Sequence, residues 1–64
     1  MIPEGFLDVK TNEPPLWEDV VFVLDDGRRV TGYFSGTMHV KDEYMDANDR
    51  KLTGVIAWKR TYEI

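Results

Sequence analysis

Residues 20–36 have the sequence VVFVLDDGRRVTGYFSG, and this stretch decides the fold. A valine-rich apolar run precedes an Asp-Asp-Gly turn, and a second run with alternating apolar residues follows it. β-Branched and aromatic residues on both sides of a glycine-containing turn are typical of a β-hairpin. We therefore predict a hairpin over residues 20–35.

Two registers of this hairpin are open. A two-residue loop would pair Leu24 with Arg29, whereas a three-residue loop closed by Gly27 would pair Leu24 with Arg28. We favour the three-residue loop because it gathers the larger apolar set on one face. That face carries Val20, Phe22, Leu24, Val30 and Phe34. The opposite face carries Val21, Val23, Arg29, Thr31 and Tyr33, and it needs cover from the N-terminal segment or from a partner.

The residues before the hairpin favour irregular structure. Residues 1–19 hold all three prolines, which cannot donate to a strand ladder. The apolar residues at positions 6–9 are expected to form a short strand or to lie over the core. Trp17 is expected to be a lid on the core rather than an exposed binding anchor, because a small core needs its aromatic residues.

The residues after the hairpin return to strand chemistry only near the end. Residues 37–40 could form a short third strand. Residues 41–51, KDEYMDANDRK, predict a polar loop or one helical turn with Tyr44 and Met45 pointing inward. Residues 52–64 predict a C-terminal strand with Trp58 on the apolar face and Ala57 on a solvated face.

Length and composition limit the fold to one small domain over residues 1–64. We predict a mainly β fold: a small antiparallel sheet of three to five strands, as an open meander or an SH3-like barrel, with at most one short helical turn. The chain has no cysteine, which excludes disulfides and thiolate sites and fits a reducing compartment. No apolar run approaches the roughly 20 residues that span a bilayer, and the start, MIPEGF, does not resemble a signal peptide. We therefore expect a cytoplasmic protein without membrane contact.

The charge balance disfavours direct nucleic-acid binding. Twelve acidic residues against eight basic ones give a net charge of −4. The basic residues come mainly as pairs with acidic neighbours, rather than as one patch that tracks phosphates. An acidic surface instead suits a basic protein partner.

No motif in the sequence predicts catalysis, a cofactor or a metal. The acidic loop resembles a calcium loop starting at Asp46, but Lys51 stands where glycine is needed and Ala57 where glutamate is needed. His39 is the sole histidine and has no cysteine or second histidine to complete a site. We therefore predict that the protein is not an enzyme.

The hairpin resembles the first motif of the Sm-like family. A turn glycine, Gly27, separates alternating apolar residues, and a second glycine, Gly32, lies in the following strand. The segment KDEYMDAND echoes the family's Asp-x-x-Met-Asn through Asp42 and Met45, with Asp46 in place of the RNA-binding asparagine. This resemblance implies an SH3- or Sm-like module that binds RNA or forms a ring.

A second resemblance covers residues 13–58. Small phage and prophage proteins of a domain of unknown function share a similar layout: a Leu-Pro-like start, a valine-rich strand ending in Asp-Gly, an aromatic second strand and a closing Val-x-x-Trp. Here these parts look like EPPLWEDV, VVFVLDDG, VTGYF and VIAW. The order of Leu and Pro is reversed, and KRTYEI replaces a proline-rich tail. The resemblance implies a phage accessory protein with a small β fold.

Together these observations predict a non-enzymatic phage or prophage protein that binds a host protein. One form of this role is an inhibitor that uses its acidic surface. The alternatives are the RNA-binding or ring-forming module and a structural component of a virion. The candidate contact residues are Val21, Val23, Arg29, Tyr33, Asp42, Glu43, Asp46 and Asp49.

Overall fold

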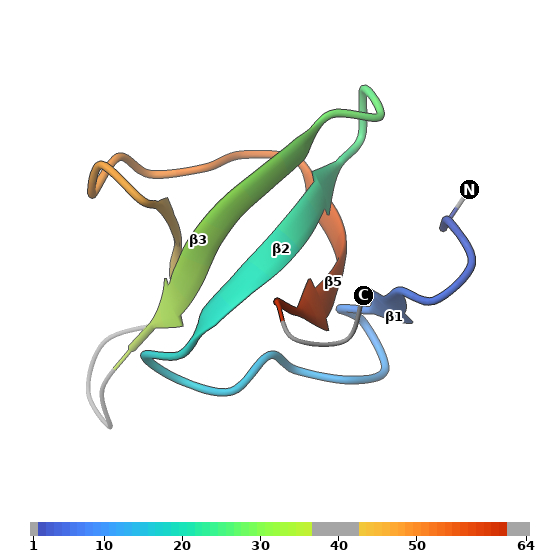
Figure 1. Cartoon of the computed structure of the whole chain (residues 1–64), viewed down its shortest axis with the longest axis horizontal. Coiled ribbons are helices and arrows are strands. Elements are labelled where there is room, and N and C mark those ends of the chain that lie inside the picture. The colour runs from blue at the N-terminus through green and yellow to red at the C-terminus, as the bar shows by residue number, and fades with distance from the viewer. Residues whose placement is uncertain (1, 37–42, 62–64) are drawn as a thin grey trace.

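The computed structural model describes residues 2–36 and 43–61, and these ranges contain five β-strands and no helix. The strands are β1 (Leu7–Asp8), β2 (Asp19–Leu24), β3 (Arg29–Ser35), β4 (Glu43–Asp46) and β5 (Val55–Arg60). All neighbours are antiparallel, and the order in the sheet is β1-β5-β2-β3-β4 (Figure 1). The prediction of a small antiparallel sheet of three to five strands is confirmed.

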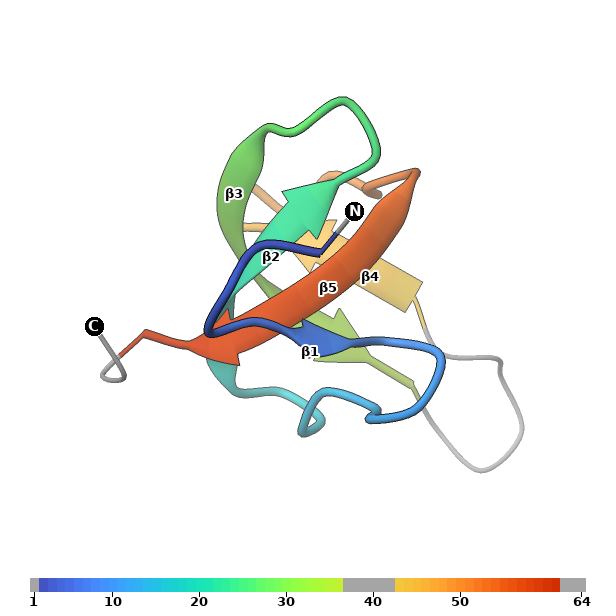
Figure 2. The same cartoon turned by 90° about the vertical axis from the view of Figure 1, so that its right-hand side faces the viewer.

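The sheet is open, because β1 and β4 are its two edges. It is not a simple meander, since β5 lies between β1 and β2. Figure 2 shows the sheet strongly twisted, with β4 running behind β5. Tyr44 of β4 packs against the buried cluster that includes Trp58 of β5. The curled sheet therefore encloses a core on its concave side without closing into a barrel.

The hairpin of β2 and β3 has the three-residue loop. The backbone N–H of Leu24 donates to the carbonyl of Arg28 at 2.8 Å, and Phe22 pairs with Val30. Gly27 has a φ of +90°, a left-handed conformation that glycine adopts without a steric penalty. The favoured register is confirmed.

Apolar side chains are buried on both faces of the sheet. We call the concave side the inner face; its buried cluster consists of Val20, Phe22, Phe34 and Trp58. The indole N–H of Trp58 donates to the carbonyl of Asn12 at 2.8 Å, so the polar end of this buried ring is satisfied. The other side, which carries Tyr33, is the outer face; its smaller buried cluster consists of Phe6, Val23 and Ala57.

The position of Ala57 corrects a prediction. Ala57 is fully buried rather than solvated, because Phe6 packs over it on the outer face. The N-terminal segment reaches this place since Leu7 pairs with Trp58 and Asp8 with Ala57 in the β1–β5 ladder. The N-terminal segment therefore supplies part of the cover that the outer face needs.

The segment after the hairpin also differs from its prediction. Part of the predicted polar loop over residues 41–51 is the edge strand β4, in which Tyr44 and Met45 point to opposite faces rather than both inward. This strand forms because Gly32 lets it approach β3 closely. A Cβ on Gly32 would overlap the carbonyl oxygen of Met45. The expected strand over residues 37–40 lies outside the described residues.

Candidate functional site

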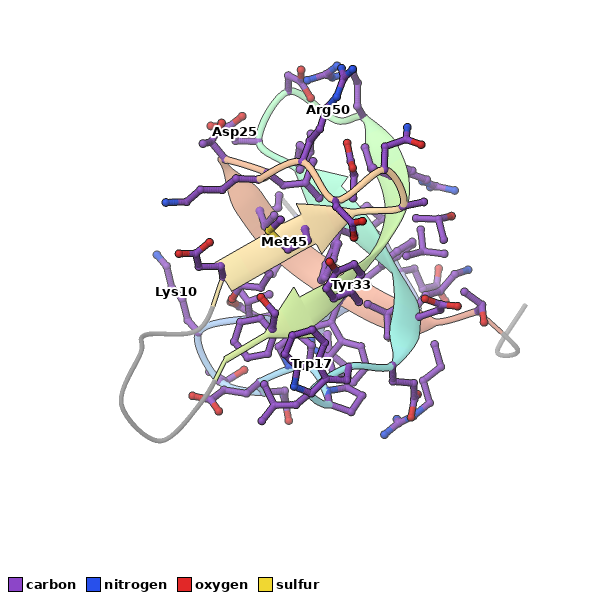
Figure 3. The ribbon with its side chains drawn as sticks, turned by 90° about the vertical axis from the view of Figure 1, so that its left-hand side faces the viewer. Lys10, Trp17, Asp25, Tyr33, Met45 and Arg50 are labelled. Atoms are coloured by element: carbon purple, nitrogen blue, oxygen red, sulfur yellow. The ribbon has the colours of Figure 1, made fainter. Side chains whose placement is uncertain are left out.

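The centre of the candidate site is Tyr33, a half-buried residue on the outer face of β3. In the sheet it pairs with Asp19 of β2 on one side and with Met45 of β4 on the other. Paired residues of antiparallel strands point to the same face, so these three side chains are neighbours on the surface. Figure 3 shows Tyr33 beside β4, with Trp17 adjacent to it.

Trp17 lies on the surface, and its prediction as a core lid is wrong. Its side chain is 63% exposed, and its ring stacks on that of Tyr33 with centroids 5.6 Å apart and planes 24° from parallel. The backbone N–H of Trp17 donates to the carbonyl of Phe34 at 2.8 Å. The inner core is already filled by the ring of Trp58 and its neighbours. The two tryptophans therefore have opposite environments, one buried and one on the surface.

Asp49 holds the other side of Tyr33. The tyrosine hydroxyl donates to Asp49 Oδ1 at 2.6 Å. Asp49 closes a three-residue loop in which the N–H of Asp46 donates to the carbonyl of Arg50 at 2.9 Å. Asp46 stabilises this loop, since its Oδ1 accepts the backbone N–H groups of Asn48 and Arg50 at 2.8 and 2.9 Å. The loop thus repeats the geometry of the β2–β3 turn, with an aspartate in the place of Gly27.

Two residues that contact Tyr33 have unusual backbone conformations. Among the described residues, Trp17 and Asp49 are the non-glycine residues with positive φ, each at 62°. The left-handed region costs about 1–2 kcal/mol for an L-residue, and it is a clear outlier for a bulky side chain. Aspartate at the third position of a turn adopts this region readily, so the strain belongs to Trp17. The fold places Trp17 against Tyr33 in spite of that strain, a feature that clusters at functional sites.

Negative charges surround the hydroxyl of Tyr33. The hydrogen bond to Asp49, together with loss of solvent and the negative charges of Asp49 and Asp46, raises the pKa of Tyr33 above its ordinary value of 10.0. The cause is that the neutral phenol donates the hydrogen bond, whereas a phenolate would face a carboxylate. Tyr33 is therefore a neutral donor over the physiological range.

The other candidate contact residues do not all join this site. Val23 is 1% exposed against Phe6 and Ala57, so it is part of the core and leaves the candidate set. Val21 is half-buried beside the same cluster. Arg29 lies over the ring of Phe6, with its guanidinium carbon 5.2 Å from the ring centroid.

The remaining candidates lie at different distances from Tyr33. Arg29 is four residues from Tyr33 on β3, about 13 Å along the strand, so the two residues lie at different ends of the outer face. Glu43 is half-buried at the start of β4, opposite Ser35. Asp42 lies outside the described residues. The structure therefore brings together Tyr33, Asp46 and Asp49, and it adds Trp17 and the neighbouring exposed Leu16.

The sequence favoured Trp17 as a core lid over an exposed binding anchor, although one signal pointed to exposure. In the segment PPLW, Leu16 and Trp17 follow two prolines, which cannot donate to a regular ladder. Leu16, which is 51% exposed, forms a single parallel bridge with Phe34. A tryptophan placed there can turn outward, which a composition argument about small cores does not register.

The acidic turns of the protein have structural roles. Asp26 accepts the backbone N–H of Arg28 at 3.0 Å and its Nε at 2.8 Å. The backbone hydrogen bond from Arg28 is the main cause that lowers the pKa of Asp26 below its ordinary value of 3.8. Across residues 2–36 and 43–61, no three His, Cys, Asp or Glu side chains are arranged to hold a metal ion.

Comparisons with known proteins leave this site without a precedent. No protein-family model, no curated protein and no solved structure matches the chain. Within the described ranges, no helix has the length and apolar character to cross a membrane. The geometry of the outer face is therefore the basis for a functional proposal.

Proposed function

We propose that this chain is a non-enzymatic binding protein that docks on a partner protein through the Trp17–Tyr33 pair and the acidic side chains around it. The observation that carries the proposal is the exposed ring of Trp17. Two features hold this ring in place: the strained backbone of Trp17 and the stacking on Tyr33. A ring that is already fixed loses little conformational freedom when it meets a partner.

The residue types support a protein interface. Tryptophan and tyrosine dominate the energetics of interfaces because they bury a large apolar area and keep a polar tip. Leu16, the residue before Trp17, is a second exposed apolar residue in this segment. Asp49, in the loop that Asp46 stabilises, supplies a polar rim next to the ring of Tyr33. An apolar centre with a polar rim is the usual arrangement of a docking surface.

The partner that fits this surface is a protein with a basic patch. The chain has a net charge of −4, and the carboxylates of Asp49 and Asp19 lie beside Tyr33. Opposite charges steer association and disfavour partners of the same sign. Together with the resemblance to small phage proteins over residues 13–58, this favours an accessory protein that inhibits a host protein in the host cytoplasm.

The experiment that tests the proposal is affinity capture from a bacterial lysate treated with nuclease, with the tagged chain and two variants side by side. Trp17→Gly removes the ring and suits the positive φ of that position. Leu7→Ala removes an exposed apolar side chain of β1, and it is the matched control. We expect a stoichiometric partner with the wild type and with Leu7→Ala, and its loss with Trp17→Gly.

Two results would contradict the proposal. A partner that is retained by Trp17→Gly binds elsewhere on the molecule, and the aromatic pair is then not the docking surface. A capture that disappears with nuclease would favour the RNA-binding alternative, which predicts an affinity that falls steeply with salt.

A further inference from the structure

The carboxylates around the aromatic pair have no cation of their own among the described residues. Within residues 2–36 and 43–61 the ion pairs are Arg28 with Asp26 and Arg60 with Glu18. Neither pair involves the aspartates near Tyr33. Asp19 pairs with Tyr33 in the ladder, Asp49 accepts the hydrogen bond of its hydroxyl, and the charge of Asp46 helps to raise its pKa. The surface next to the two rings therefore carries negative charge that the described basic residues do not neutralise.

The ring of Trp17 offers a flat electron-rich face beside this charge. One face of the ring stacks on Tyr33, and because the residue as a whole is 63% exposed, ring surface remains open to a partner. Tryptophan is the side chain that binds cations most strongly over its ring. The protein already uses such contacts elsewhere, since Lys59 and Arg60 lie 4.8 and 5.3 Å from the ring centroids of Phe6 and Trp58.

We propose that the Trp17–Tyr33 pair receives an arginine side chain of the partner, whose guanidinium stacks on Trp17 and pairs with the carboxylate of Asp19 or Asp49. This inference rests on the proposed docking function and names its chemistry. Arginine fits better than lysine because a planar guanidinium stacks on an aromatic ring while its N–H groups reach a carboxylate in the same plane. A nucleotide fits poorly, because its phosphate would meet the carboxylates of Asp19 and Asp49.

The test is a titration that follows the two indole N–H signals by NMR. The ligand is a blocked Gly-Arg-Gly tripeptide, and the matched ligand carries citrulline, which has nearly the same shape but no charge. A third ligand, a blocked tri-proline peptide, tests an uncharged occupant. One side chain of this kind binds in the millimolar range, so high ligand concentrations are required.

The expected result is specific for the charge and for the exposed ring. The arginine peptide shifts the Trp17 signal saturably and leaves that of the buried Trp58 unchanged. The citrulline peptide binds with an affinity about fivefold lower. Asp19→Asn weakens arginine binding by about two- to fivefold, the range for an exposed ion pair. Glu4→Gln changes the net charge equally in the exposed N-terminal segment and leaves the affinity unchanged.

The outcomes separate this inference from the function on which it rests. Equal shifts with arginine and citrulline, or a stronger effect of the proline peptide, would overturn the arginine inference. If arginine fails here while Trp17→Gly still loses the captured partner, the docking surface stands and its occupant is different. If Trp17→Gly keeps the partner, the proposed function and this inference both fail.

Discussion

Replacing Trp17 by alanine and by glycine separates the cost of its backbone from the gain of its ring. Both variants remove the stacking on Tyr33, which is worth about 0.5–1.5 kcal/mol. Alanine keeps the strain of the positive φ, about 1–2 kcal/mol, whereas glycine does not. Glycine loses about 0.5–1 kcal/mol more conformational entropy on folding than alanine. We therefore expect Trp17→Gly to be more stable than Trp17→Ala by about 0.5–1 kcal/mol.

Urea denaturation measures this difference. In both variants the remaining tryptophan is Trp58, a buried ring whose fluorescence reports on the core. With an m-value of about 1 kcal/mol/M, the glycine variant should unfold at a urea concentration about 0.5–1 M higher than the alanine variant. Because the total stability of such a small domain is only about 3–5 kcal/mol, this shift is large enough to resolve.

An alanine variant that is as stable as the glycine variant, or more stable, would refute the reasoning. Trp17 would then have an ordinary backbone conformation in solution, and its ring would not be held on Tyr33 in the way described. A glycine variant as stable as the wild type would show that strain and stacking offset each other, which leaves binding as the main reason for a tryptophan at this position.

Three further predictions concern the surroundings of the site. Gly32→Ala should destabilise the protein by about 1–3 kcal/mol or more in urea, because its Cβ would overlap a backbone carbonyl of β4. The pKa of Tyr33 should lie above 10.0, and Asp49→Asn should lower it towards that value in an NMR titration of the ring. The stability that the hydrogen bond of the neutral tyrosine contributes is complete below the ordinary pKa, and it is lost as pH rises through the raised pKa. Phe6→Ala should cost about 3–5 kcal/mol and leave much of the chain unfolded by circular dichroism.

Each of these predictions has a control and a contradicting result. Thr31→Ala on the exposed face of β3 should change stability little, and a Gly32→Ala variant of similar stability would mean that β4 does not pack closely there. An unchanged Tyr33 pKa in Asp49→Asn would exclude the hydrogen bond. A folded Phe6→Ala variant would show that the N-terminal segment does not cover the outer face.

The hairpin was predictable because its signals are local. Alternating apolar residues and a glycine at the third loop position favour one register, and the burial of Phe22 with Val30 opposite follows from it. The burial of Val23 was not predictable, since it depends on Phe6, seventeen residues earlier in the chain. The strand β4 was missed for a similar reason, because its polar residues form a strand through pairing with β3 rather than through their own propensity.

The candidate site was predictable only in part. Tyr33 was expected on the second face of the hairpin, and Asp49 in the acidic loop was named beside it. Their hydrogen bond across sixteen residues, and the stacking of Tyr33 on Trp17, arise from the tertiary fold. An exposed tryptophan and a buried one have the same composition signal, so the sequence alone does not distinguish Trp17 from Trp58.

The exchange of the two indole N–H protons with solvent shows whether Trp17 lies on the surface of the free protein. We expect one slow proton, that of Trp58, which is buried and bonded to the carbonyl of Asn12, and one fast proton, that of the exposed Trp17. Assignment follows from Trp17→Gly, which removes the fast signal and leaves the slow one. If both protons are protected in the free protein, Trp17 is a core residue and the proposed docking surface does not exist.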